Sequence, residues 1–427
     1  MHSIDRCFRM SALFRFSLLL LLLLCFSLPA AAKRIELDIA SSGVRKLAVA
    51  VPPFTGGSAG KKVSSMLIKG LDFHGFIRIV DADRAGADQN WRGSGADYVV
   101  LGKVSDQGGK MVVEGALLDV PANKTLPTKR FSGPSSQHDE LALQLADALI
   151  KDFTGEPGIS QTSIAFVSDA TGSKEIYIAD VLGRHVRQVT RHNNLCVSPR
   201  FSPDGRLLAY SSYHRGNQNL YITDLNQSRL TKALSRREGM NLAPAFAPDG
   251  KSMIITLSKD GNPDLYRLDM QGQIIERLTK GSGINVSPSY SPDGKSICFV
   301  SDRSGRPQVY LMNLRSGNTR LLTLQGQENV EPSWSPKGDK IAYTSLNGGH
   351  YHIFTISAEG GSPTRITSGY GDYESPSWSP DGRQIAFSRK RNGRMQLCAI
   401  MANGQGERVL FRLPGNQSYP RWSPRSR

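Results

Sequence analysis

One short segment of the chain has the residue pattern of a nucleophilic serine. Gly56-Gly57-Ser58-Ala59-Gly60 matches the Gly-x-Ser-x-Gly turn in which many hydrolases hold their catalytic serine between a strand and a helix. In that turn the first glycine follows the strand directly, whereas here Pro52-Pro53-Phe54-Thr55 lies in between. The region around the segment is also too short for the sheet that carries the acid and the histidine of such enzymes. We therefore interpret the segment as a flexible turn.

A second segment offers two imidazoles. His350 and His352 are two residues apart, so on a strand they share one face, as metal ligands need. His352, however, occupies a position of an internal repeat at which other copies carry Asn219, Asp264 and Gln308, and this favours a polar strand residue. The recurring Asp-Gly pairs lack the alternating carboxylates of a calcium loop. We predict no catalytic residue, no metal and no cofactor.

The elements that position these residues follow from the internal repeat. A motif of an aromatic residue followed by Ser-Pro-Asp-Gly, or a close variant, recurs with its prolines 45 residues apart once and 44 residues apart four times. The copies are Phe201–Gly205, Phe246–Gly250, Tyr290–Gly294, Trp334–Gly338, Trp378–Gly382 and Trp422–Pro424. A fixed period between about 20 and 50 residues is typical of a solenoid or a propeller.

Each repeat has the composition of four short strands. The run Lys340–Thr344 shows the β-branched and aromatic alternation of a strand, and proline and glycine mark the turns. About 44 residues with four strands make one propeller blade. The first repeat lacks an aromatic-Ser-Pro strand and the chain ends with one, so the two fragments should complete one blade. We predict a six-bladed β-propeller over residues 158–427, closed by its C-terminal strand.

Residues 33–157 lack the repeat and predict a small α/β domain. Strand-like runs lie at 46–51, 76–80, 98–104 and 111–120, and helical runs lie at 61–71 and 139–153. In the second helical run, the residues that fall on one face are Leu141, Leu145, Ala148 and Leu149. Gly155-Glu156-Pro157-Gly158 then forms a natural linker into the propeller. The predicted fold is therefore mainly β, with a six-bladed propeller preceded by an α/β domain.

The N-terminus has the pattern of a cleaved export signal. Arg6, Arg9 and Arg15 precede an apolar run that begins at Leu18, and Ala30-Ala31-Ala32 follows it. A membrane anchor is the alternative, but the run is shorter than the roughly 20 residues that span a bilayer. We predict a signal peptide over residues 1–32 and a mature chain that begins near Lys33.

The net charge limits the classes of partner that the chain can be expected to bind. The formal net charge is +16, but the basic residues are scattered and are not interleaved with stacking aromatics, so we expect no nucleic-acid partner. A surface that faces anionic lipid or an acidic partner fits better.

Cys196, Cys298 and Cys398 fall in three different repeats at three different strand positions, which predicts buried thiols and no disulfide framework.

The repeat, the blade count, the leader and the α/β domain together resemble the TolB family of the Tol-Pal cell-envelope system. The most specific segments are Ala50–Phe54, Ala243–Gly250, Gly305–Tyr310 and Tyr419–Pro424. The resemblance implies a non-enzymatic, monomeric protein of the periplasm that binds the peptidoglycan-associated lipoprotein Pal and communicates with the inner-membrane protein TolA. It also implies roles in outer-membrane integrity and cell division, and use of the protein by colicins during import. Other outer-membrane or peptidoglycan-associated proteins are further partners that the resemblance implies.

In that family, loops at one mouth of the propeller channel receive Pal. The loop ahead of each aromatic-Ser-Pro strand leads from one blade to the next, so all six loops should surround one mouth. The resemblance implies Pal-binding residues in these loops: Met240, Asn241, Asn285, Glu328, Asn329 and Tyr373. The alternative is that the asparagines merely cap tight turns. The segment facing TolA is implied by its position: Lys33, Arg34, Ile35, Glu36, Leu37 and Asp38.

Two other functions stay open at this stage. A propeller enzyme, either a hydrolase that uses Ser58 or a lyase that acts at the channel mouth, would need clustered carboxylates or histidines facing the channel, and the repeat register shows none there. A periplasmic scaffold with a different partner is also compatible, because a fold does not determine a function.

Overall fold

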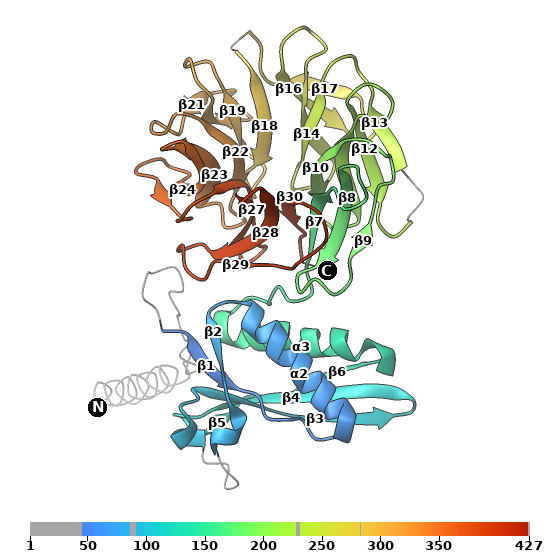
Figure 1. Cartoon of the computed structure of the whole chain (residues 1–427), viewed down its shortest axis with the longest axis vertical. Coiled ribbons are helices and arrows are strands. Elements are labelled where there is room, and N and C mark those ends of the chain that lie inside the picture. The colour runs from blue at the N-terminus through green and yellow to red at the C-terminus, as the bar shows by residue number, and fades with distance from the viewer. Residues whose placement is uncertain (1–44, 86–90, 228–230, 282, 426–427) are drawn as a thin grey trace, which may run out of the picture.

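The computed structural model describes residues 45–85, 91–227, 231–281 and 283–425. Figure 1 shows a propeller, coloured green to red along the chain, above a smaller domain coloured blue to teal. The predicted architecture of a six-bladed propeller preceded by an α/β domain is confirmed. The predicted signal peptide and the predicted TolA-facing segment lie outside the described residues.

The N-terminal domain is a single sheet in the order β2-β1-β3-β4-β5, with β6 also on β4. Strand β1 is parallel to β2 and β3, and β3 and β4 form an antiparallel hairpin. The strands are β1 Leu47–Ala50, β2 Ile77–Val80, β3 Tyr98–Gln107, β4 Lys110–Asp119, β5 Lys124–Thr125 and β6 Lys129–Gly133. The four predicted strands are all present, while β5 and β6 were not predicted because short polar segments carry no alternation.

Two helices cover one face of this sheet. They are α2 Gly57–Phe73 and α3 His138–Thr154, and single 3₁₀ turns occur at Ala82–Ala85, Trp91–Ser94 and Ser135–Gln137. Leu67 and Leu71 of α2 meet Leu145 and Leu149 of α3 in the domain core, where all four are buried. The helices touch closely at Gly70, since a Cβ there would lie only 2.8 Å from an α3 side chain. The helical face read from the sequence is therefore the face that packs.

The propeller consists of six antiparallel four-stranded blades. Blade 1 contains β30 Gln417–Trp422, β7 Ser163–Ser168, β8 Glu175–Asp180 and β9 Arg187–Gln188. Blade 2 contains β10 Cys196–Phe201, β11 Leu207–Ser212, β12 Asn219–Asp224 and β13 Thr231–Ser235. Blade 3 contains β14 Asn241–Phe246, β15 Ser252–Leu257, β16 Asp264–Asp269 and β17 Ile274–Arg277.

The other three blades repeat this plan. Blade 4 contains β18 Asn285–Tyr290, β19 Ser296–Ser301, β20 Gln308–Asn313 and β21 Thr319–Leu321. Blade 5 contains β22 Asn329–Trp334, β23 Lys340–Asn347, β24 His350–Ser357 and β25 Thr364–Arg365. Blade 6 contains β26 Asp372–Trp378, β27 Gln384–Arg391, β28 Arg394–Met401 and β29 Arg408–Val409.

The C-terminal strand closes the ring as predicted. Strand β30 pairs with β7, with Gln417 opposite Ser168 and Trp422 opposite Ile164. The Trp422 indole is 7% exposed, and its Nε1 donates a hydrogen bond of 2.8 Å to Thr162 Oγ1. Closure removes the unpaired strand edges that an open sheet would present.

Every inner strand carries a bulge at the same place. The pairing register shifts within each strand, for example between Val286 and Ser289. One residue inside each bulge has a left-handed backbone with φ of 53 to 59°: Ser198, Ala243, Ser287, Glu331, Ser375 and Tyr419. A bulge bends and twists its strand. The six inner strands therefore turn in the same way where they line the channel.

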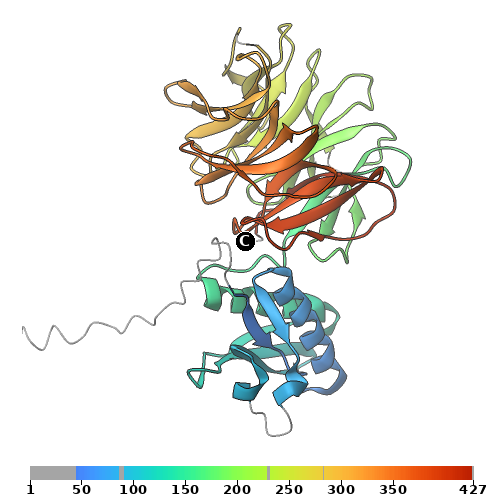
Figure 2. The same ribbon diagram turned by 60° about the vertical axis from the view of Figure 1, so that its left-hand side comes forward.

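The end of helix α2 anchors the α/β domain to blades 6 and 1, as Figure 2 shows. The Phe73 ring lies 6.1 Å from the Trp422 ring, between centroids. The Phe73 carbonyl accepts hydrogen bonds from Arg408 at 2.9 Å and Gln384 at 3.2 Å. An ion pair of 2.7 Å between Arg184 and Asp139 adds a second link. The closing strand thus also contacts the N-terminal domain.

Candidate interaction site at the channel mouth

Six loops lead from the outer strand of one blade to the inner strand of the next. We call them the mouth loops, and their described residues are 189–195, 236–240, 278–281, 283–284, 322–328, 366–371 and 410–416. Because every blade has the same strand order, all six open on the same end of the channel. This is the end at which the sequence predicts partner-binding residues.

The asparagines predicted here are the first residues of the inner strands, and they are buried. Asn241, Asn285 and Asn329 have no exposed surface. The Asn241 amide nitrogen donates to the carbonyls of Gln218 and Arg237 at 2.9 and 2.7 Å. These side chains hold the backbone of the mouth loops in place.

The residues at the equivalent position of other blades also form hydrogen bonds that hold the mouth loops. The Asn285 amide binds Asp264 Oδ1 at 3.0 Å and accepts from Arg303 at 2.7 Å. The Tyr373 ring is 3% exposed, and its hydroxyl donates to the Ser368 carbonyl at 2.7 Å. These side chains therefore shape the mouth loops, and other side chains form the loop surface.

Apolar side chains are exposed on four neighbouring mouth loops. Met240 is 42% exposed, Ile284 44%, Leu324 82% and Tyr370 65%. Of these, only Met240 was predicted. Ile284, Leu324 and Tyr370 were missed, although an apolar residue in an otherwise polar loop just before an inner strand is a signal that the sequence contains. The predicted Glu328 is partly exposed, and its carboxylate accepts from the Tyr351 hydroxyl at 3.1 Å.

Exposed basic side chains accompany these apolar tips at the same end of the channel. Arg191, Arg236 and Lys280 lie in mouth loops, and Arg215 and Arg306 lie in the adjacent loops between the second and third strands of their blades. The mouth therefore combines apolar contact area with positive charge. Such a surface suits an acidic partner with apolar anchors.

The channel contains a pair of carboxylates, which corrects the expectation that the register places none there. Glu331 and Glu374 come from the neighbouring inner strands β22 and β26. The Glu331 carboxylate accepts from the Ser375 backbone N–H at 2.7 Å, the Ser375 hydroxyl at 2.9 Å and the Thr344 hydroxyl at 3.1 Å. Burial, and then the charge of Glu331, raise the pKa of Glu374 to about 7. The repeat does not indicate this pair, because the equivalent positions of the other blades carry no glutamate.

The two segments with catalytic or metal-binding patterns have structural explanations. Gly56 has φ 109°, and a Cβ on it would lie 2.3 Å from the Val104 carbonyl oxygen, so glycine is needed where the chain enters α2. The interpretation of this segment as a flexible turn was wrong, because Gly57 to Gly60 form the first turn of α2. His352 is buried beside Arg365, with 2.8 Å between Nε2 and the guanidinium, and burial lowers its pKa to about 4. No group of three His, Cys, Asp or Glu side chains in the described part of the chain is placed to hold a metal ion.

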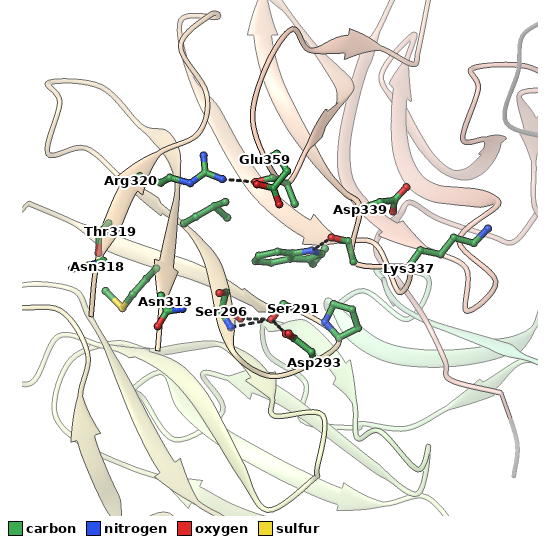
Figure 3. A pocket seen from close by; sticks show the side chains of 16 residues that line it. Ser291, Asp293, Ser296, Asn313, Asn318, Thr319, Arg320, Lys337, Asp339 and Glu359 are labelled. Carbon is green, nitrogen blue, oxygen red and sulfur yellow. Dashed lines mark hydrogen bonds between the residues drawn. The ribbon is translucent and has the colours of Figure 1, made fainter. Parts of the chain in front are cut away.

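A separate cavity lies at the other end of the propeller, between blades 4 and 5. It has a volume of about 750 Å³ and is bordered by the turns after the first and third strands of those blades. Figure 3 shows Arg320, Asp293 and Glu359 around it, with the Arg320 guanidinium bonded to the Ala358 carbonyl. The cavity is thus separate from the mouth loops.

The predicted cysteines are confirmed as buried free thiols, and burial raises the pKa of Cys196 to about 12. No helix among the described residues is long and apolar enough to cross a membrane. The predicted residues Lys33 to Asp38 lie outside the described part of the chain.

The fold and the mouth define the chain as a two-domain β-propeller protein with an N-terminal α/β domain. Residues 150–426 match the family model described as the TolB beta propeller domain, and residues 35–126 match the model of the TolB amino-terminal domain. The chain belongs to the TolB family.

Individual relatives agree with this assignment. A protein of Desulfotalea psychrophila named Tol-Pal system protein TolB is 49% identical over 234 residues, which cover 51% of this chain and 53% of that protein. A namesake from Desulfosudis oleivorans is 37% identical over 234 residues, covering 50% and 53%. In these alignments the chain spans about half the length of the curated relatives. The crystal structure of TolB from Acinetobacter baumannii superposes with a TM-score of 0.81 at 28% identity, covering 90% of this chain and 98% of that one.

Proposed function

We propose that this chain is a non-enzymatic component of the Tol-Pal system in the periplasm. It binds the peptidoglycan-associated lipoprotein Pal through the mouth loops and communicates with TolA through Lys33 to Asp38. Through these contacts it helps to maintain the outer membrane and to draw it inward at cell division. The names of the relatives and the export signal in the sequence support this assignment.

The observation that carries the Pal site is the row of apolar side chains on four adjacent mouth loops. A single exposed apolar residue is ordinary, but Met240, Ile284, Leu324 and Tyr370 occupy equivalent loops of consecutive blades. Their loops are held by buried side chains such as Asn285, so little conformational entropy is lost when a partner binds. A preorganised apolar surface with a basic surround is what a protein partner with acidic patches requires.

The test is calorimetric titration of the mature chain with the soluble domain of Pal from the same cell. Two exposed residues are changed together, Leu324→Ser and Tyr370→Ser, and the matched control is Ile275→Ser, an apolar side chain 52% exposed on the outer strand β17. We expect saturable binding by the natural chain and the control, and at least about tenfold weaker binding by the double variant. Binding that the double variant keeps would move the site away from the mouth, and no binding by the natural chain would refute the assignment.

A second variant separates loop shape from direct contact. Asn329→Ala removes a buried amide that binds the carbonyl of Gln325 and the side chain of Gln308, both at 2.6 Å. If the asparagines act through the loops, this variant should lose Pal affinity together with thermal stability. Loss of affinity at unchanged stability would instead indicate that the asparagine meets Pal directly.

The TolA contact is tested separately. Deleting Lys33 to Asp38 should abolish binding of the TolA periplasmic domain and leave Pal binding measurable. TolA binding that survives the deletion would refute this part of the proposal.

A further inference from the structure

The channel end opposite the mouth loops contains a second concave site. A cavity of about 350 Å³ is lined by the aromatic-Ser-Pro segments of the blades together with Arg200 and Arg421. These two arginines occupy the same position, just before the aromatic residue, in the neighbouring inner strands β10 and β30. Blades 4, 5 and 6 carry Ser289, Ser333 and Ser377 at this position. Two guanidinium groups thus share one cavity with small hydroxyl side chains.

Neither guanidinium has a carboxylate partner among the residues that the structure describes. Arg200 donates from Nη1 to the neighbouring Pro199 carbonyl at 3.1 Å. Arg421 donates from Nη1 to the carbonyls of Pro420, Ser375 and Pro376 at 2.8, 3.3 and 3.2 Å, while its Nε is buried without a hydrogen-bond acceptor. A guanidinium carries five N–H donors, so both residues retain donors that are not used.

This arrangement is costly unless an anion is present. Both side chains are half-buried, and a half-buried cation without a carboxylate partner loses part of its hydration and gains little compensating charge. Burial lowers the pKa of Arg200 to about 10, although the negative charge of Glu331 acts in the opposite direction and raises this pKa. Glu331 is already engaged by three hydrogen bonds, and Glu374 beside it has a pKa raised to about 7 and so carries only part of a charge at neutral pH. The channel carboxylates therefore leave the two arginines with excess positive charge.

The serines add donors of the right kind. The hydroxyl oxygens of Ser289 and Ser377 accept hydrogen bonds from the backbone N–H groups of Trp334 and Trp422, at 3.1 and 2.9 Å. An oxygen that accepts in this way keeps its own O–H proton for another partner. Guanidinium and hydroxyl donors around one cavity match the oxygens of a tetrahedral oxyanion.

We propose that this cavity binds a phosphate-class oxyanion between Arg200 and Arg421. The anion is either free phosphate or the phosphate group of a small molecule, since the cavity volume of about 350 Å³ exceeds what phosphate alone fills. The site is separate from the mouth loops and does not depend on the proposed Pal interaction.

The test uses the mature chain in a chloride buffer, with inorganic phosphate as the probe in calorimetry and thermal melts. Arg200→Ser and Arg421→Ser introduce the residue that three other blades already carry, so both variants should fold, as far-UV circular dichroism checks. Arg412→Ser, on an exposed mouth loop, is the control. We expect phosphate to bind and to raise the melting temperature of the natural chain and the control. Each single variant should bind at least about tenfold more weakly.

Melts without phosphate and binding of other anions complete the test. In the absence of phosphate, the two variants should melt no lower than the natural chain, because each removes a poorly compensated charge. Glycerol phosphate should bind if the site accepts a phosphate group on a small molecule, and free phosphate alone should bind if it does not. A phosphate effect that equals that of sodium chloride at matched ionic strength, one that both serine variants retain, or binding of succinate without binding of phosphate would overturn the proposal.

Discussion

Replacing Trp422 by alanine tests whether the closing strand stabilises the whole ring. The indole is 7% exposed, packs against Phe73 of the other domain and bonds to Thr162. Truncating a buried tryptophan costs about 3 to 5 kcal/mol, from lost apolar burial and the cavity left behind. For a domain of this size that corresponds to a fall in melting temperature of about 6 to 20 °C. Because a native domain is stable by only about 5 to 15 kcal/mol, the loss is a large fraction of the total.

Thermal and urea melts followed by circular dichroism measure this effect, with Trp334→Ala as the comparison. Trp334 occupies the same repeat position in blade 5 but is partly exposed, so its truncation should cost less. Removing residues 419–427, and with them most of β30, should be more damaging than Trp422→Ala because β7 then loses its partner strand. A free energy of unfolding within about 1 kcal/mol of the natural chain, for both Trp422→Ala and the truncation, would show that the closing strand does not stabilise the ring.

Three further changes follow from individual contacts. Glu374→Gln should raise the free energy of unfolding at pH 8 by about 1 to 2 kcal/mol, a value discounted for partial solvation. The reason is that the folded-state pKa of Glu374, raised to about 7, makes its ionisation beside Glu331 costly. The gain should vanish near pH 4, and urea melts at both pH values measure it. Burial lowers the pKa of His74, so its contribution to stability is present above the unfolded pKa of about 6.5 and is lost as pH falls below it. His74→Gln should therefore flatten the dependence of the free energy of unfolding on pH between about pH 7 and 5. An unchanged slope of that dependence would contradict this. Gly56→Ala should destabilise by roughly 1 to 3 kcal/mol or more, through positive φ and the clash with a carbonyl, whereas Gly57→Ala, with positive φ but open space, should cost less in the same melts.

Local sequence features were sufficient to predict the architecture. The 44-residue period determines equivalent strands, and the unmatched fragments at its two ends determine that β30 must join β7. Helical spacing in 139–153 identified the face that carries Leu145 and Leu149 into the core. These inferences succeeded because strand alternation and helix periodicity are properties of neighbouring residues.

The surface of the mouth was harder to predict. Asn285 and Asn329 were predicted as binding residues because asparagine recurs at this repeat position. It recurs because each side chain fills the same buried position behind a mouth loop. Leu324 and Tyr370 do not recur as residue types and were missed, although they are the most exposed apolar side chains of the mouth loops. A repeat thus identifies what the fold needs, and the residues that distinguish this propeller are those that depart from it.

By itself the sequence determined the number of blades, the closure of the ring by the C-terminal strand, the presence of an α/β domain and the family. Tertiary structure alone decided which side chains meet between different blades and between the two domains. It pairs Glu331 with Glu374, puts Arg200 and Arg421 into one cavity, and sets Phe73 against Trp422. The physical reason is that secondary structure is set by spacing along the chain, whereas charge balance and packing in the channel depend on ring closure, which brings together residues hundreds of positions apart.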